Sequence, residues 1–150
     1  MTEILFYHLQ RQSIEHVLPA LLEKSVARGW RVVVQGGSEE RIEALDAHLW
    51  TYREGSFLPH GTWREPEPAQ QPILLTVNDE NLNGATVRFL VDSVPVPENA
   101  GTYERIVLLF NGDDPDAVET ARMRWREAKK QGFDLTYWQS DEHGRWHQKA

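Results

Sequence analysis

The chain contains no cysteine in its 150 residues, and this absence removes several kinds of chemistry. Disulfides, thiolate zinc sites, iron–sulfur clusters and a cysteine nucleophile are excluded, which leaves six scattered histidines and the carboxylates as candidate metal ligands. Long apolar runs are also missing. Runs such as Val32–Val34 and Ile106–Phe110 are far shorter than the roughly 20 residues of a membrane-spanning helix. We therefore expect no membrane span, no metal and no cofactor.

A secretory signal requires basic residues ahead of an apolar stretch. The N-terminus has none, and the acidic Glu3 stands where the positive charge would belong. We therefore expect a cytoplasmic protein. The formal net charge is −7, whereas nucleic-acid affinity depends on neutralising phosphates with lysine and arginine. Strong direct DNA binding is thus not expected, and any anion site must be local. Six tryptophans point weakly to an interaction surface, because tryptophan is enriched at binding hot spots.

The first half of the chain alternates strand and helix patterns. Strands are predicted at 4–7 and 30–35, and apolar residues at helical spacing follow Ser13 and Ser38, which are good N-caps. Pro19 lies inside the first helical pattern, where it should kink the helix or shift its start. Strands joined by helices of this length indicate βαβ units and a mainly parallel sheet.

The second half begins with an irregular segment. Glycines and prolines between Tyr52 and Pro72 rule out a long regular element there. Further strands are predicted at 73–77, 87–91 and 105–110, then a helix from the turn at 111–115 to 131, and an edge strand at 133–139 with a short terminal hairpin at Gly144. We expect one domain over residues 1–150. It is an α/β fold with a central, mainly parallel mixed sheet and helices on both faces, Rossmann-like but without a dinucleotide motif.

Two turns have the position of phosphate or metal sites in α/β enzymes. Gly36-Gly37 lies between a strand and a helix, yet neither GxGxxG nor GxxxxGK[ST] occurs, so a plain βα turn is favoured. Asp113 and Asp114 follow a buried strand, and helix capping is the better interpretation because no second carboxylate cluster converges there. A small nucleotide- or phosphate-binding enzyme that uses these turns remains the alternative function.

The histidines give no stronger indication of catalysis. His143 and His147 are four residues apart, but no helix is predicted around them and no third ligand is evident. His60 has no nucleophile partner in the sequence, and no GxSxG motif occurs. We therefore expect no catalytic residues.

The last predicted helix carries two stripes. An apolar stripe that includes Val118 and Trp125 runs beside a basic stripe that includes Arg122, Arg126 and Lys129. Between positions 122 and 131 there are five basic residues and a single acid, in a chain of net charge −7. The basic end complements the helix dipole, so the stripe could be purely structural. Two arginines one turn apart, next to an aromatic edge, could equally hold a carboxylate-rich peptide.

Several ordered segments resemble the chi subunit family of bacterial DNA polymerase III. The helix end Leu49-Trp50 followed by Ser56-Phe57-Leu58-Pro59-His60, and the Arg-x-Arg-Trp-Arg helix, are the most specific. The match also includes Phe6-Tyr7, Asp46–Tyr52, Glu104–Phe110, Ala121–Arg126 and Gly132-Phe133. The resemblance implies a non-catalytic clamp-loader accessory with an α/β fold. An accessory of this family links the replicase to single-stranded DNA-binding protein by gripping that protein's acidic, phenylalanine-ended C-terminal tail, and it binds the small psi subunit on another face. The resemblance implies both roles for this chain.

The resemblance also implies roles for particular residues. Arg122, Arg126 and Lys129 resemble the tail-binding cations and Trp125 an apolar wall, while Trp50 and Phe57 resemble the contacts to psi or an equivalent clamp-loader component. Trp50 and Phe57 could instead be core residues that cover the sheet edge. One departure concerns the turn before Arg122, where the family often has a further basic residue and this chain has Val118 and Glu119.

Overall fold

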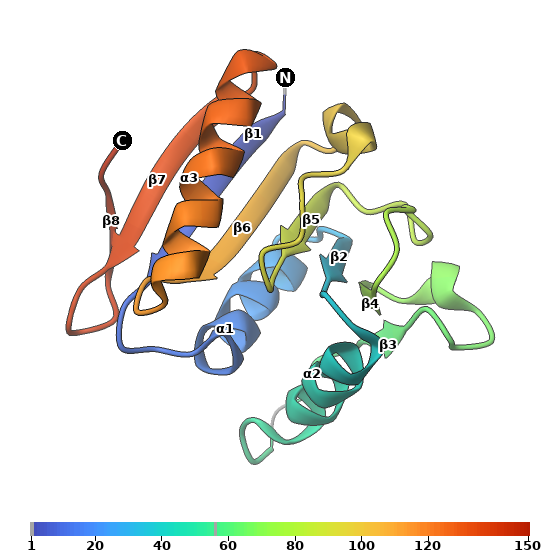
Figure 1. The fold of residues 1–150 in the computed structure, drawn as a ribbon. Helices are drawn as coiled ribbons and strands as arrows, with labels where there is room; N and C mark the ends of the chain where they lie inside the picture. The colour runs from blue at the N-terminus through green and yellow to red at the C-terminus, as the bar shows by residue number, and fades with distance from the viewer. Residues whose placement is uncertain (1, 56) are drawn as a thin grey trace.

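The computed structural model describes residues 2–55 and 57–150. All described strands join one sheet in the order β3-β4-β2-β5-β6-β1-β7-β8, and only β8 runs antiparallel to its neighbour. The strands are β1 (Glu3–Leu9), β2 (Val32–Gln35), β3 (Gly61–Thr62), β4 (Ile73–Thr76), β5 (Val87–Leu90), β6 (Arg105–Asn111), β7 (Asp134–Ser140) and β8 (Trp146–Gln148) (Figure 1). This confirms the predicted mixed, mainly parallel sheet.

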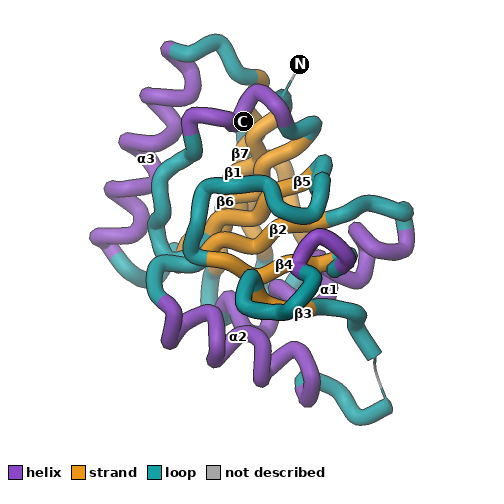
Figure 2. The backbone as a smooth tube through the Cα atoms, turned by 90° about the vertical axis from the view of Figure 1, so that its right-hand side faces the viewer, coloured by secondary structure: helices purple, strands orange, loops and turns teal. Residues whose placement is uncertain are grey.

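Three α-helices cover the two faces of the sheet, as expected. They are α1 (Ile14–Ala27), α2 (Glu39–Thr51) and α3 (Pro115–Lys130). The apolar sides of α1 and α2 pack on one face around Val34 and Ile73, and α3 packs on the other around Ile4 and Phe6. Figure 2 shows α3 and α1 on opposite sides of the strands. No described helix is long and apolar enough to cross a membrane.

The structure confirms that the irregular segment holds no long element, and it differs from the sequence-based expectation at the sheet edge. The segment 52–72 contains the two-residue strand β3 and a short 3₁₀ helix, Pro68–Gln70. The strand β7 is not the edge, because β8 pairs with it through the predicted terminal hairpin, with Ser140 opposite Trp146. The edge of the sheet next to β7 is therefore the short β8.

Pro19 neither shifts the start of α1 nor ends the helix. The helix begins at Ile14, where the side chain of Ser13 accepts a hydrogen bond from the His16 amide, and Pro19 lies buried in its second turn. A proline cannot donate to the carbonyl four residues before it, which here is that of Glu15. The ring nitrogen Nε2 of His48, on α2, donates to this carbonyl at 2.7 Å. A neighbouring helix thus satisfies the acceptor that the proline leaves free.

On the sheet face that α3 covers, no described α-helix lies over β5 and β2; residues 94–103, including the 3₁₀ helix Glu98–Thr102, pack there instead. The fully buried side chain of Arg88, on β5, holds this covering segment in place through a hydrogen bond. Its guanidinium donates to the Tyr103 hydroxyl at 2.9 Å and to Gln35 Oε1 at 2.7 Å. The exposed end of the α3 face, beside β7, is consequently the side on which a pocket can open.

Candidate functional site

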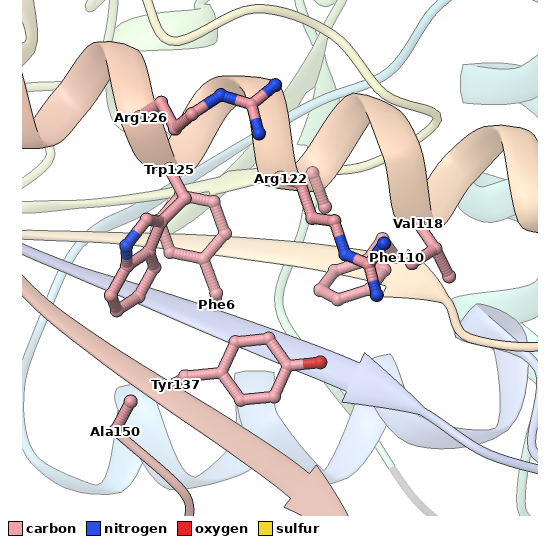
Figure 3. A pocket seen from close by; sticks show the side chains of 9 residues that line it. Phe6, Phe110, Val118, Arg122, Trp125, Arg126, Tyr137 and Ala150 are labelled. Carbon is pink, nitrogen blue, oxygen red and sulfur yellow. The ribbon is translucent and has the colours of Figure 1, made fainter.

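A pocket of about 430 Å³ opens between α3 and the strands β1, β6 and β7. Its lining combines aromatic side chains of the sheet with small and basic residues of the helix, as Figure 3 shows: Phe6, Phe110, Val118, Ala121, Arg122, Trp125, Arg126, Tyr137 and Ala150. The volume lies within the range of ordinary ligand pockets. This pocket contains three of the four residues that the resemblance assigns to tail binding.

Sheet register brings the aromatic floor together. Phe6 and Tyr137 are direct partners in the parallel pairing of β1 with β7, and Phe110 comes from β6 on the other side of β1. Trp125 descends from α3 and meets both Phe6 and Tyr137 edge-on, with ring centroids 5.2 and 6.2 Å apart. Alternate strand residues point to the same face, so all these rings lie on the α3 side. The floor is an apolar surface that fits another ring.

Two guanidinium groups form the basic rim. Arg122 and Arg126 are exposed, and neither side chain has an ion pair or hydrogen bond with any residue that the structure describes. Arg124, by contrast, lies near Glu127 at 3.7 Å and donates to the Ser93 carbonyl at 3.4 Å. The Arg122 guanidinium extends toward Phe110, on the side to which the Tyr137 hydroxyl points (Figure 3). The two arginines are therefore available to an anionic ligand.

Two other residues of α3 differ in their position relative to the pocket. Lys129 is exposed on α3 but does not line the pocket, so it can reach a ligand only beyond the pocket's edge. Val118, one turn before Arg122, contributes to the pocket wall. The pocket is therefore apolar at this position.

Beneath the pocket, His8 is hydrogen-bonded through Nδ1 to the Tyr137 hydroxyl. Burial lowers the pKa of His8, with Asp113 opposing and Arg122 reinforcing the shift. Burial also raises the pKa of Tyr137, which Arg122 partly counteracts. The imidazole and the phenol are therefore both neutral near pH 7, and a hydrogen bond joins Nδ1 to the hydroxyl. Sequence reasoning missed Phe6, Phe110 and Tyr137 as pocket residues, because only the strand register reveals that they are neighbours.

A second feature is the exposed aromatic pair Trp50 and Phe57. Their side chains are 48% and 75% exposed, and the ring centroids are 5.9 Å apart. The alternative prediction that they are core residues is wrong. The ring of His60 packs against Trp50, with the two ring centroids 4.2 Å apart. His60 is buried and hydrogen-bonded to the Leu58 carbonyl at 2.6 Å. Ser56, part of the same motif, lies outside the described residues.

The turns that could have held phosphate or metal have internal partners. The Gly37 amide donates to the Asp92 carboxylate at 3.3 Å. Asp113 accepts from the Arg11 amide at 3.0 Å, and Asp114 caps α3 by accepting from the Asp116 amide. His147 pairs with Asp141 at 2.8 Å. Among residues 2–55 and 57–150, no group of three or more side chains is placed to hold a metal ion.

The fold and the pocket together define an α/β protein with an arginine-rimmed aromatic pocket on one face of its sheet. Comparison with known proteins identifies the family: residues 1–136 match the model described as "DNA polymerase III chi subunit, HolC". The chain belongs to this family, whose name places it in DNA replication.

Two relatives show the extent of the similarity. A probable DNA polymerase III subunit chi of Rickettsia prowazekii (strain Madrid E) is 28% identical over 115 residues, which cover 73% of this chain and 70% of the relative. The DNA polymerase III subunit chi of Pseudomonas aeruginosa PAO1 is 25% identical over 115 residues, which cover 77% of this chain and 78% of the relative.

Proposed function

We propose that this protein is a non-catalytic accessory subunit that links the clamp-loader complex of DNA polymerase III to single-stranded DNA-binding protein. The pocket on α3 grips the acidic, phenylalanine-ended C-terminal tail of that protein. Trp50 and Phe57 hold a psi subunit or an equivalent clamp-loader component. The protein reaches DNA and the nucleoid through these partners, because its net charge of −7 opposes direct DNA binding.

One observation supports the tail assignment above the others: unpaired arginines border an apolar aromatic pocket. A ring buried among Phe6, Trp125 and Tyr137 contributes about 1.5–3 kcal/mol by leaving water. Carboxylates beside that ring can accept charge-assisted hydrogen bonds from Arg122 and Arg126, and such bonds contribute about 1.5–3 kcal/mol each. A peptide that ends in an aromatic residue and carries acidic residues gains both the burial of its ring and the hydrogen bonds to its carboxylates.

The test measures binding of an acidic peptide that ends in phenylalanine by isothermal titration calorimetry. Arg122→Glu and Arg126→Glu should each weaken binding at least about tenfold, because each loses a hydrogen bond to a charged group and adds repulsion. Replacing the terminal phenylalanine of the peptide by alanine should weaken binding by a similar factor. Added salt should also weaken it, since exposed charges are screened over roughly 8–10 Å.

Lys130→Glu is the matched control, because it makes the same change of charge on the same helix at an exposed residue that does not line the pocket. It should leave the affinity within about twofold of the parent, and all three variants should unfold within about 0.5 kcal/mol of it. Equal affinities for the parent and both arginine variants refute the tail assignment.

A further inference from the structure

A second cleft, of about 160 Å³, lies on the sheet face opposite the α3 pocket. It is bordered by the last turn of α1, by β1, β5 and β6, and by Trp146 of β8. Tyr7 contributes to it from β1, and its neighbour Phe6 points into the α3 pocket, because consecutive strand residues face opposite sides. Ligands in the two cavities therefore cannot touch each other.

Three cations meet at this cleft: Lys24 and Arg28 from α1, and Arg105 from the start of β6. Arg28 and Arg105 each lie over the Trp30 ring, at 4.9 and 5.2 Å from its centroid. The dipole of α1 favours cations at its C-terminal end and so accounts for Lys24 and Arg28. It does not account for Arg105, which comes from the sheet.

These cations have little negative charge around them. Arg105 is 3.7 Å from Glu3, which is a loose ion pair. No ion pair or side-chain hydrogen bond joins Lys24 or Arg28 to any part of the chain that the structure describes. Three like charges with one loosely paired acid among them repel one another, and a bound anion relieves this repulsion.

The Tyr7 hydroxyl adds a neutral donor to the same cleft. Within residues 2–55 and 57–150 it has no hydrogen-bond partner. Burial raises the pKa of Tyr7, Arg105 lowers it, Glu3 raises it and Arg28 lowers it, so the hydroxyl lies within the field of both arginines. The Ser25 hydroxyl is engaged with the Leu21 carbonyl at 3.0 Å and is not a free donor.

We propose that this cleft, lined by Lys24, Arg28, Arg105 and Tyr7, binds a single phosphate group in the form of a phosphate monoester or free phosphate. A phosphate dianion presents more acceptor oxygens than a carboxylate and matches both guanidinium forks and the ammonium. The cleft is below the usual 300–1,000 Å³ of a pocket for a drug-sized ligand, so it encloses the phosphate and leaves the rest of a monoester outside. The chain's net charge of −7 opposes a long polyanion such as DNA.

The test is a titration of the full chain with inorganic phosphate at pH 7.5, against potassium chloride of the same ionic strength, followed by ¹H–¹⁵N NMR. The indole signals of Trp30 and Trp146 should shift saturably with phosphate. Arg28→Gln and Arg105→Gln should each raise the dissociation constant about tenfold or more, and Tyr7→Phe should raise it by a smaller factor. Lys130→Gln, a cation on the other face, should change nothing.

Three further measurements identify the ligand and the place. A double variant Arg122→Gln, Arg126→Gln should bind phosphate as the parent does, which separates this site from the proposed tail pocket. Adenosine monophosphate should bind like free phosphate, whereas acetate and an oligonucleotide without terminal phosphates should leave the indole signals unmoved. Non-saturating shifts, shifts equal in Arg28→Gln and the parent, loss of binding in the α3 double variant, or equal binding of acetate or of the oligonucleotide overturn the proposal.

Discussion

The hydrogen bond from His48 to the Glu15 carbonyl should stabilise the protein only because Pro19 is present. His48→Ala removes the donor and leaves a partly buried carbonyl without a partner. The cost of such a loss is about 1–2 kcal/mol, since a net hydrogen bond contributes about 0.5–1.5 kcal/mol and an unsatisfied buried acceptor costs about 1–3 kcal/mol. In a chain of 150 residues, this corresponds to a melting temperature lower by roughly 2–8 °C.

A double-mutant cycle tests the cause. In Pro19→Ala the new amide at position 19 can donate to the Glu15 carbonyl within the helix, so the carbonyl no longer depends on His48. His48→Ala should then cost about 1 kcal/mol less than it costs in the parent. The stability of Pro19→Ala itself, which combines helix propensity with lost packing of a buried ring, cancels out of the cycle.

The assay is urea unfolding followed by circular dichroism, with the free energy of unfolding compared at constant m-value. His16→Ala is the matched control, because His16 is an exposed histidine of α1, the helix that contains Glu15 and Pro19, and it should change the free energy of unfolding by less than about 0.5 kcal/mol. A coupling energy of zero within about 0.3 kcal/mol would show that the His48 ring stabilises the protein in some other way.

Two other predictions concern the proposed partner surface and the terminal hairpin. Trp50→Ala and Phe57→Ala should weaken binding of a psi-type partner, measured by calorimetry, by about 2 kcal/mol or more with near-parental melting. Leu49→Ala, at a neighbouring side chain only 2% exposed, should instead lower the free energy of unfolding by about 2–5 kcal/mol. Unchanged partner binding with strongly lowered melting in Trp50→Ala and Phe57→Ala contradicts the assignment. Hydrogen bonds from His147, and then from the backbone of Arg145 and His143, lower the pKa of Asp141 from 3.8 to about 2. The carboxylate therefore stabilises the β7–β8 hairpin fully above pH 3.8 and ceases to do so as the pH falls through about 2; the Trp146 NMR signals should report this loss in the parent, and Asp141→Asn should lack this acid transition.

Sequence patterns predicted the elements of this fold well but could not predict their neighbours. Alternation and helical spacing located the strands and α3 because they report local burial. The position of β1 between β6 and β7 depends on pairing between residues more than a hundred positions apart. The pocket floor follows from that pairing, so Trp125 could be predicted as a wall, while its partners Phe6 and Tyr137 could not.

Two local features also depend on distant residues and could not be predicted from the local sequence. Pro19 looked disruptive because its own helix offers no donor for the Glu15 carbonyl, and the donor comes from His48 on another helix. Trp50 and Phe57 are large enough to be core residues, and composition alone could not assign them. In the structure both side chains are exposed, whereas His60, whose ring packs against Trp50, is buried.

The arrangement of the two proposed partner surfaces bears on how an adaptor of this size can work. Arg122 lies on α3 and Trp50 lies in the last turn of α2, and these helices pack on opposite faces of one sheet. A peptide in the α3 pocket therefore has no direct contact with a partner on Trp50, and a packed sheet transmits little of such a local event unless an element has two arrangements. Independent sites let both partners bind at once, and an adaptor that holds both keeps each partner at a raised effective concentration near the other without any change of shape. The fold's contribution to such an adaptor is thus the separation of two small surfaces by a rigid layer.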